Sequence, residues 1–246
     1  MTKKSSALIA GLLALCGCTG TARNEWLESY NHGMFAFNTQ FNKYVLRPVA
    51  RGYRAVTTPE VRTRVNSALY NVTEPVSAGN HFLQGGFRES SVSIARFAVN
   101  TTLGLGGLFD VASGWGLQKN KTGFDATLAT LCVPDGPYLV MPIIGPSTPR
   151  SLVGYGVDGI ANPLYLASYH DKNYHDKITW SYTAVGAVAS AESSIDLLDD
   201  LERNSIDMYS TMKSAYLQNR QKVNRCADDA EATAKSYDFD FDDEEL

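Results

Sequence analysis

The sequence predicts an all-α fold. Apolar residues recur at helical spacing in several long stretches, and the alternation of period two that marks half-buried strands is almost absent. The apolar stretches end at prolines and glycines, as helices do. The chain has 246 residues, 44% hydrophobic and 20% charged, which is enough to form one large domain or two small ones with a buried core.

The N-terminus has the features of an export signal. Lys3 and Lys4 precede an apolar run over residues 7–15, which has the length of a signal peptide rather than of a transmembrane helix. The run ends in Leu15-Cys16-Gly17-Cys18, which resembles a bacterial lipobox with Cys18 as the lipidated residue; the alternative is a plain secretory signal. We expect a signal peptide over 1–17 and a lipidated linker over 18–24. Because Thr19 rather than Asp follows Cys18, the lipoprotein is expected in the outer membrane.

The first long helix is predicted over residues 26–45. One face carries an apolar stripe at four- and three-residue spacing, and the neighbouring face carries uncharged amides in place of the usual Lys and Glu. Such a helix suits a membrane interface, although a helix packed deep in a protein has the same pattern. The apolar stripe is Tyr30, Met34, Phe37, Phe41 and Tyr44, and the polar one includes Asn31, Asn38 and Asn42.

Shorter helices are predicted next, over 60–69, 76–83 and 87–99. Glu74-Pro75 separates the first two, because the residue before proline avoids the helical region, and Gly85-Gly86 separates the second from the third. An apolar, glycine-rich segment follows, in which Gly104, Gly106 and Gly107 remove helix propensity while leucines and a phenylalanine flank them. Such a segment requires apolar contact on more than one side, either a protein core or lipid.

The second half of the chain alternates connectors and helices. Two prolines enclose four apolar residues at 138–141, which predicts a short extended and buried connector. Helices are predicted over 178–191 and over 194–223. The domain is therefore expected over 25–226. An acidic tail over 227–246 has the composition of a disordered segment, and either solubilises the chain or docks a partner.

Charge and cysteines narrow the functional classes. Residues 228–246 hold nine acids and one lysine, a local charge of −8. Because the net charge of the whole chain is −4, residues 1–227 carry +4, of which Lys3 and Lys4 account for two. A near-neutral domain gives no support for nucleic-acid binding. Cys132 and Cys226 remain in the mature chain. An oxidising compartment permits a disulfide between them, but the sequence does not show that they meet.

No catalytic, metal or cofactor site is evident in the sequence. His170-Asp171 and His175-Asp176 form a doublet, but five-residue spacing does not place both imidazoles on one helix face, so a solvated loop is the better interpretation. Gly154, Gly156 and Gly159 match G-x-G-x-x-G without the surrounding βαβ pattern. A G-x-S-x-G nucleophile motif is absent. We therefore expect neither an enzyme nor a bound cofactor.

The order of motifs resembles the MlaA family, also called VacJ, of outer-membrane lipoproteins. The resemblance covers roughly residues 24–220. It rests on Asn31 with Met34-Phe35-Ala36-Phe37-Asn38, Arg47-Pro48, Asn71-Val72, Glu74-Pro75, Phe82-Leu83-Gln84-Gly85, Arg96-Phe97, Asn100-Thr101-Thr102-Leu103-Gly104, Gly107-Leu108-Phe109-Asp110, Gly136-Pro137-Tyr138-Leu139-Val140-Met141-Pro142, Gly145-Pro146-Ser147, Arg150, Ala215-Tyr216-Leu217-Gln218 and Arg220.

The resemblance implies a single ring-like helical domain around a central amphipathic channel, embedded in the inner leaflet of the outer membrane of a Gram-negative bacterium. It also implies removal of phospholipids from the outer leaflet, transfer to a soluble periplasmic phospholipid carrier, and association with a trimeric porin. For the channel lining we expect the uncharged side chains of Asn38, Asn42, Asn100, Thr101 and Thr102. Gly104, Gly106 and Gly107 are expected to form a bend or hinge in the wall of the ring.

Two other functional classes remain open at this stage. A structural or virulence-associated surface lipoprotein would affect cell-envelope contacts or intercellular spreading without a lipid path. A lipase-like envelope enzyme would release a hydrolysed lipid product.

Overall fold

The computed structural model describes residues 21–168 and 172–223. The predicted signal peptide, Cys18, the His170-Asp171 half of the histidine doublet, Cys226 and the acidic tail lie outside these ranges. The described elements are α2 (Thr21–Phe41), the π-helix η2 (Asn42–Leu46), α3 (Arg47–Val56), α4 (Pro59–Leu83), α5 (Phe87–Thr102), α6 (Val111–Gly114), α7 (Phe124–Thr130), β1 (Leu139–Met141), β2 (Gly145–Ser147), α8 (Pro149–Ile160), α9 (Pro163–Ser168), α10 (Lys172–Asn204) and α11 (Met208–Val223).

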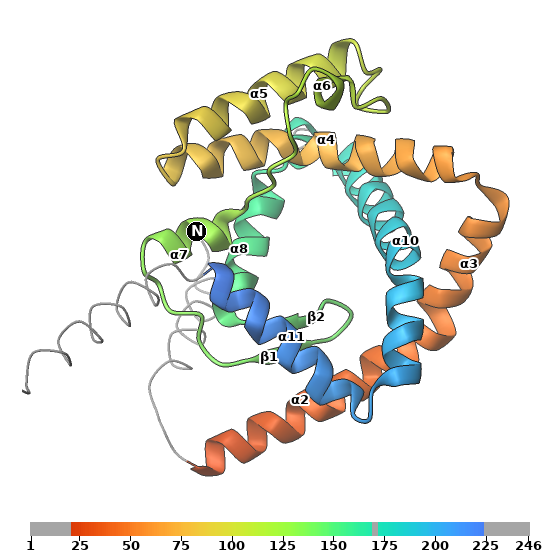
Figure 1. Cartoon of the computed structure of the whole chain (residues 1–246), viewed down its shortest axis with the longest axis vertical. Coiled ribbons are helices and arrows are strands. Elements are labelled where there is room, and N and C mark those ends of the chain that lie inside the picture. The colour runs from red at the N-terminus through yellow and green to blue at the C-terminus, as the bar shows by residue number, and fades with distance from the viewer. Residues whose placement is uncertain (1–20, 169–171, 224–246) are drawn as a thin grey trace, which may run out of the picture.

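The helices are arranged as a ring, which confirms the predicted all-α, ring-like fold. In Figure 1, α2 lies along the bottom, α3 and α10 along the right, α4 across the top and α8 on the left, while α11 crosses towards the lower right. α5 and α6 form an outer layer on the far side of α4 from the middle of the ring. The strands β1 and β2 pair antiparallel, with Val140 opposite Pro146, in a small hairpin next to α2 and α11.

α2, η2 and α3 form one continuous helical path. Pro48 has no N–H for the carbonyl of Tyr44 and its ring clashes there, and the chain accommodates this with a π-helical turn over Asn42–Leu46. The path therefore ends at Val56 rather than near the predicted Val45. The arginines of α3 then pair with acids of α10: Arg54 Nε lies 2.8 Å from Glu192 Oε1. These ion pairs hold α3 against α10.

α4 is continuous, so the break predicted at Glu74-Pro75 is wrong. Thr58 caps the helix by accepting from Val61 N, and Pro59 occupies the first turn. Pro75 costs the helix the bond to the carbonyl of Asn71, about 3 kcal/mol. The helix continues because α5 holds it on both sides of Pro75. Before the proline, Asn71 donates to Thr101 and Glu74 accepts from Arg96; after it, Ser90 of α5 donates to the carbonyl of Ala78. This tertiary contact, which local propensity does not encode, outweighs the proline penalty.

The break near the C-terminus is also displaced from its predicted place. α10 runs through the predicted gap at 192–193, and the chain breaks at 205–207 instead. Asp207 begins the next helix as its cap, since its carboxylate accepts from Tyr209 N at 3.0 Å. The apolar spacing from Leu198 to Tyr209 hid this cap, because it continues across the break.

Candidate functional site

The surface of the ring is unusually apolar and its interior unusually polar. Among the described residues, buried polar and charged side chains outnumber buried hydrophobic ones, whereas large hydrophobic residues are exposed on nearly every helix. A water-soluble protein of this size shows the opposite pattern. The exposed residues include Trp26, Tyr44, Val56, Phe82, Phe87, Ile94, Leu103, Leu105, Trp115, Leu131, Ile143, Ile160, Leu166 and Trp180. In the part of the chain that the structure describes, no helix is both long and apolar enough to cross a membrane.

A pocket of ≈ 710 Å³ lies between α4, α7, α8 and α11, and we call it the polar pocket. Its volume is in the range of small-molecule sites. α4 contributes Thr73, Val76 and Ser77; the segment before α7 contributes Lys121, Thr122 and Gly123; α7 contributes Asp125 and Ala126; α8 and the residues after it contribute Ser151, Gly154, Tyr155, Asp158, Gly159 and Asn162; α11 contributes Tyr216, Asn219, Arg220 and Val223. The lining thus mixes hydroxyl, amide and apolar groups.

The acids of the polar pocket are neutralised by fixed partners. Asp125 accepts from Arg150 Nε at 3.0 Å and also pairs with Arg220. Burial alone would raise the pKa of Asp125, but the hydrogen bonds from Arg220 and Arg150 outweigh burial and lower the pKa below its usual value. Asp135 completes the cluster by pairing with both arginines. The guanidinium charges are therefore used internally rather than offered to a ligand.

Asp158 is held by a second network. Its carboxylate accepts from Asn80 Nδ2 at 3.0 Å and from the backbone N–H of Phe124. Thr127 in turn donates to Asn80 Oδ1 at 2.8 Å. A pocket with acids this firmly held presents to a ligand chiefly hydroxyls, amides and carbon.

A second pocket of ≈ 470 Å³ adjoins the first. The two share Lys121, Thr122, Ala126 and Val223 in their linings, and Lys222 lines the second. A polar region with two lysines therefore continues from the polar pocket.

The predicted lining residues Asn38 and Asn42 lie at the junction of α2 and η2. Asn38 does not line a described pocket: its Nδ2 donates to Met141 O at 2.8 Å and its Oδ1 accepts from Ile143 N at 2.7 Å. Asn31 makes the equivalent pair three residues earlier, to Tyr138 O and Val140 N. Asn42 is half-buried in the π-helical turn. The amides beside the aromatic stripe therefore hold the β-hairpin against α2.

The other three predicted lining residues lie at the end of α5. Asn100 is buried, donates to Asp110 Oδ1 at 3.1 Å and accepts from Ala112 N at 2.9 Å, so its amide organises the following turn instead of lining a path. Thr101 is exposed and accepts from Asn71 Nδ2. Thr102 is exposed and donates to the carbonyl of Ala98. These residues belong to the outer layer of the fold.

The glycine-rich turn, residues 103–109, closes back on α4. Gly106 and Gly107 have φ of 72° and 93°, in the left-handed region. A side chain on Gly107 would overlap the Asn71 side chain of α4. The glycines therefore let the backbone approach α4 closely, and the turn lies in the outer layer with α5 (Figure 1) rather than along the middle of the ring.

A buried ion-pair network anchors that turn. Arg96 Nε lies 2.5 Å from Glu74 Oε1, with both side chains almost fully buried, and Arg96 also reaches Asp110 at 3.1 Å and the carbonyl of Leu117. Burial alone would raise the pKa of Asp110, but hydrogen bonds from Ser113, Lys119 and Asn100 with the Arg96 charge lower it. The network fixes α5 and the glycine-rich turn on α4.

The remaining predicted positions are only partly described. Cys132 is disulfide-bonded, and Cys226, its predicted partner, lies outside the described residues, as does the lipidation site Cys18. His175 contacts Ser168 Oγ at 2.9 Å. In residues 21–168 and 172–223, no group of three His, Cys, Asp or Glu side chains is placed to hold a metal ion.

Sequence reasoning missed the residues that line the polar pocket. They come from four helices and the connectors beside them, spread over residues 73–223, and none of them stands in a recognisable local motif. The sequence does contain isolated arginines, such as Arg150 and Arg220, and a buried arginine needs an acidic partner. That pairing requires knowledge of the fold.

The fold and the site together define a helical, lipid-contacting protein with a polar interior. The family model described as MlaA lipoprotein matches residues 23–223. The chain is 32% identical to the intermembrane phospholipid transport system lipoprotein MlaA of Haemophilus influenzae, over 91% of each chain. It is also 32% identical to the protein of that name in Escherichia coli K12, over 89% of this chain and 87% of the relative.

One solved structure gives the same result. It is described as "Structural basis for maintenance of bacterial outer membrane lipid asymmetry", and this chain matches it with a TM-score of 0.69 and 31% identity, over 81% of this chain and 98% of that one. The chain therefore belongs to the MlaA lipoprotein family, as the motifs predicted.

Proposed function

We propose that this protein removes phospholipids from the outer leaflet of the outer membrane and passes them inwards through its ring. The relatives are named for intermembrane phospholipid transport, and the matching structure for outer-membrane lipid asymmetry. The observation that carries the proposal is the reversed polarity of the ring. An apolar exterior matches surrounding lipid, while the polar pocket between α4, α7, α8 and α11 offers a headgroup hydroxyl and amide partners away from hydrocarbon.

The polar pocket supports passage rather than tight binding. Asp125 is paired with Arg150 and Arg220, and Asp158 accepts from Asn80 and from the backbone N–H of Phe124. A passing headgroup therefore meets chiefly hydroxyls and amides such as Ser77 and Asn162, with the ammonium of Lys121 beside them. A path that must release its cargo needs weak, repeated contacts rather than one strong charge. The protein acts as a conduit without catalysis, and its direction of transport comes from partners.

The partners and location belong to the same proposal. Lipidated at Cys18, the protein is anchored to the periplasmic side of the outer membrane with its apolar helices in the inner leaflet. A trimeric porin provides a lateral neighbour, and a soluble periplasmic phospholipid carrier receives the lipid. The exposed aromatic and aliphatic residues of several helices give it surface for both lipid and a membrane neighbour.

Deletion of the gene tests the proposal. We expect more phospholipid in the outer leaflet, measured by outer-leaflet labelling, and greater sensitivity to detergent with chelator. The intact gene should restore both, and a Cys18→Ser variant should not. Unchanged leaflet composition in the deletion strain would contradict the proposal and favour a structural lipoprotein. Release of a hydrolysed lipid by the purified protein would favour an enzyme.

A further inference from the structure

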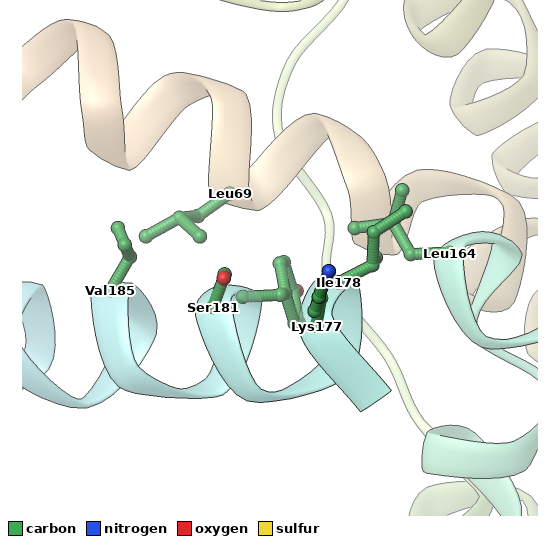
Figure 2. A pocket seen from close by; sticks show the side chains of 7 residues that line it. Leu69, Leu164, Lys177, Ile178, Ser181 and Val185 are labelled. Atoms are coloured by element: carbon green, nitrogen blue, oxygen red, sulfur yellow. The ribbon is translucent and has the colours of Figure 1, made fainter. Parts of the chain in front are cut away.

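A separate, largely apolar groove of ≈ 390 Å³ lies where α4, α9 and α10 meet, and we call it the side groove. Its lining is Leu69 from α4, Leu164 from α9, and Lys177, Ile178, Ser181, Tyr182 and Val185 from α10. Figure 2 shows Leu69 reaching down from α4 towards the row of α10 side chains, with Leu164 closing one end.

The α10 residues of the side groove occupy one face of that helix. Lys177, Ser181 and Val185 are four residues apart, as are Ile178 and Tyr182, so the two rows are neighbours on the helix surface. From Lys177 to Val185 the face extends about 12 Å along the helix axis. The groove is therefore an elongated apolar strip with a single charged residue at one end.

The charge at that end is available for a ligand. Lys177 is exposed, and within the described residues it has no ion-pair or hydrogen-bond partner. Other charged groups, such as Arg54, Glu192 and Asp125, are paired. An unpaired ammonium next to an apolar strip is complementary to a molecule that joins a phosphate to a hydrocarbon chain.

The side groove is also connected to the polar pocket. Leu69 lines the groove, and Thr73 and Val76, four and seven residues later on the same face of α4, line the polar pocket. The backbone N–H of Leu164, which lines the groove, donates to Asn162 Oδ1 of the polar pocket at 2.9 Å. A ligand leaving the groove would thus meet the polar pocket directly, beside Asn162.

We propose that the side groove is a phospholipid site, in which one acyl chain lies along Ile178, Val185 and Leu69 while the lipid phosphate pairs with Lys177. This inference rests on the proposed function and adds a named position to its path. Lipid bound here is held before it enters the polar pocket. The site is selective for an anionic phosphate attached to hydrocarbon, and it does not require a particular headgroup alcohol.

The test uses the purified, full-length, lipidated protein in vesicles containing phosphatidylglycerol with a photoactivatable group in its acyl chain. After illumination, we expect labelled peptides from α10 around residues 178–185 and from α4 around Leu69. Ser181→Trp should fill the groove and remove this labelling. The matched control is Thr183→Trp, which adds the same bulk to an exposed position on the opposite face of α10 and should leave the labelling intact.

The role of Lys177 is tested in the same vesicles. Lys177→Gln should lower labelling at the groove by about fivefold, the effect of a lost exposed ion pair, and Lys177→Arg should restore it. Equal labelling in wild type, Ser181→Trp and Lys177→Gln would overturn the groove proposal. So would label confined to other helices. In either case, phospholipid that co-purifies with the protein and a rise of outer-leaflet phospholipid in the deletion strain would leave the proposed function standing. If both of these results were absent as well, the proposed function would also be contradicted.

Discussion

Gly107 lies where the glycine-rich turn contacts α4, and the contact leaves no room for a side chain. The residue has a φ of 93°, and its Cα faces the Asn71 side chain so closely that a Cβ would overlap it. Gly106, next to it, also has a left-handed backbone but open space around it. The two positions therefore separate the cost of backbone conformation from the cost of a clash.

We expect Gly107→Ala to destabilise the protein by about 2–4 kcal/mol, because strain and overlap add. Gly106→Ala should cost about 1 kcal/mol from backbone strain alone. Chemical unfolding in detergent micelles measures both. Equal costs for the two variants would show that the Asn71 contact yields easily and that only the backbone matters.

Arg96 illustrates why a buried charge can be irreplaceable even by another charge. Its guanidinium bonds Glu74, Asp110, Ser113 and the carbonyl of Leu117 at once, from a position that is 1% exposed. Lysine carries the same charge but lacks the planar fork of donors. Arg96→Lys therefore leaves buried acceptors without partners.

We expect Arg96→Lys to lower the free energy of unfolding by about 3 kcal/mol. Arg88→Lys, an exposed change on the same helix, should cost less than about 0.5 kcal/mol. Thermal unfolding of both variants in one detergent gives the comparison. A small loss for Arg96→Lys would indicate that water enters the network and replaces the missing donors.

At the scale of elements, α2 and β1 fit together because two amides on the helix are spaced by nearly the same distance as the backbone groups that they bond. Asn31 and Asn38 are seven residues apart on a helix, about 10.5 Å along its axis. The backbone positions that they hold are three residues apart on an extended strand, about 10 Å. Each amide offers one donor and one acceptor, so two side chains replace the edge of a missing neighbouring strand.

Removing these amides should free the hairpin. We expect Asn31→Ala to cost about 1–3 kcal/mol, because it leaves a buried N–H and a buried carbonyl unpaired. Asn38→Ala should cost less, since Ile143 is exposed. Hydrogen exchange of the peptide over residues 138–143 should accelerate in both variants. Asn42→Ala, one turn further along and away from the hairpin, serves as the control and should leave that exchange unchanged.

The same elements show how far the sequence determined the fold. Helical spacing identified the aromatic face of α2, the extent of α5 and the extended connector at 138–141, because each is set by local pattern. Continuity through Pro75 depends on Glu74 and Asn71 reaching α5, and the polar pocket depends on four helices meeting. Such long-range contacts leave no local periodicity, so the residues that line the polar pocket were not among those predicted from the sequence.

At the scale of the whole molecule, the last helix is joined to the middle of the chain by four charges. Asp125 of α7 and Asp135 of the following connector each pair with Arg150 of α8 and Arg220 of α11. The cluster therefore fastens α11 against α7 and α8 beside the polar pocket. Because the arginines stay charged at every accessible pH, the acids decide when the cluster weakens.

The pH dependence of stability follows from the lowered pKa of Asp125. In the unfolded chain this carboxyl titrates near pH 4, and in the folded protein it titrates lower. Its contribution to stability is therefore fully present above about pH 4 and is lost as the pH falls through the folded pKa.

Asp125→Asn should reduce the free energy of unfolding at pH 7 by about 2–4 kcal/mol and flatten the decline in stability below pH 4. Asp200→Asn, an exposed change on α10, should alter neither. Unfolding series from pH 7 to pH 2 in a zwitterionic detergent measure all three proteins. An Asp125→Asn protein that keeps the wild-type slope in acid would show that other carboxyls control the closure of the ring.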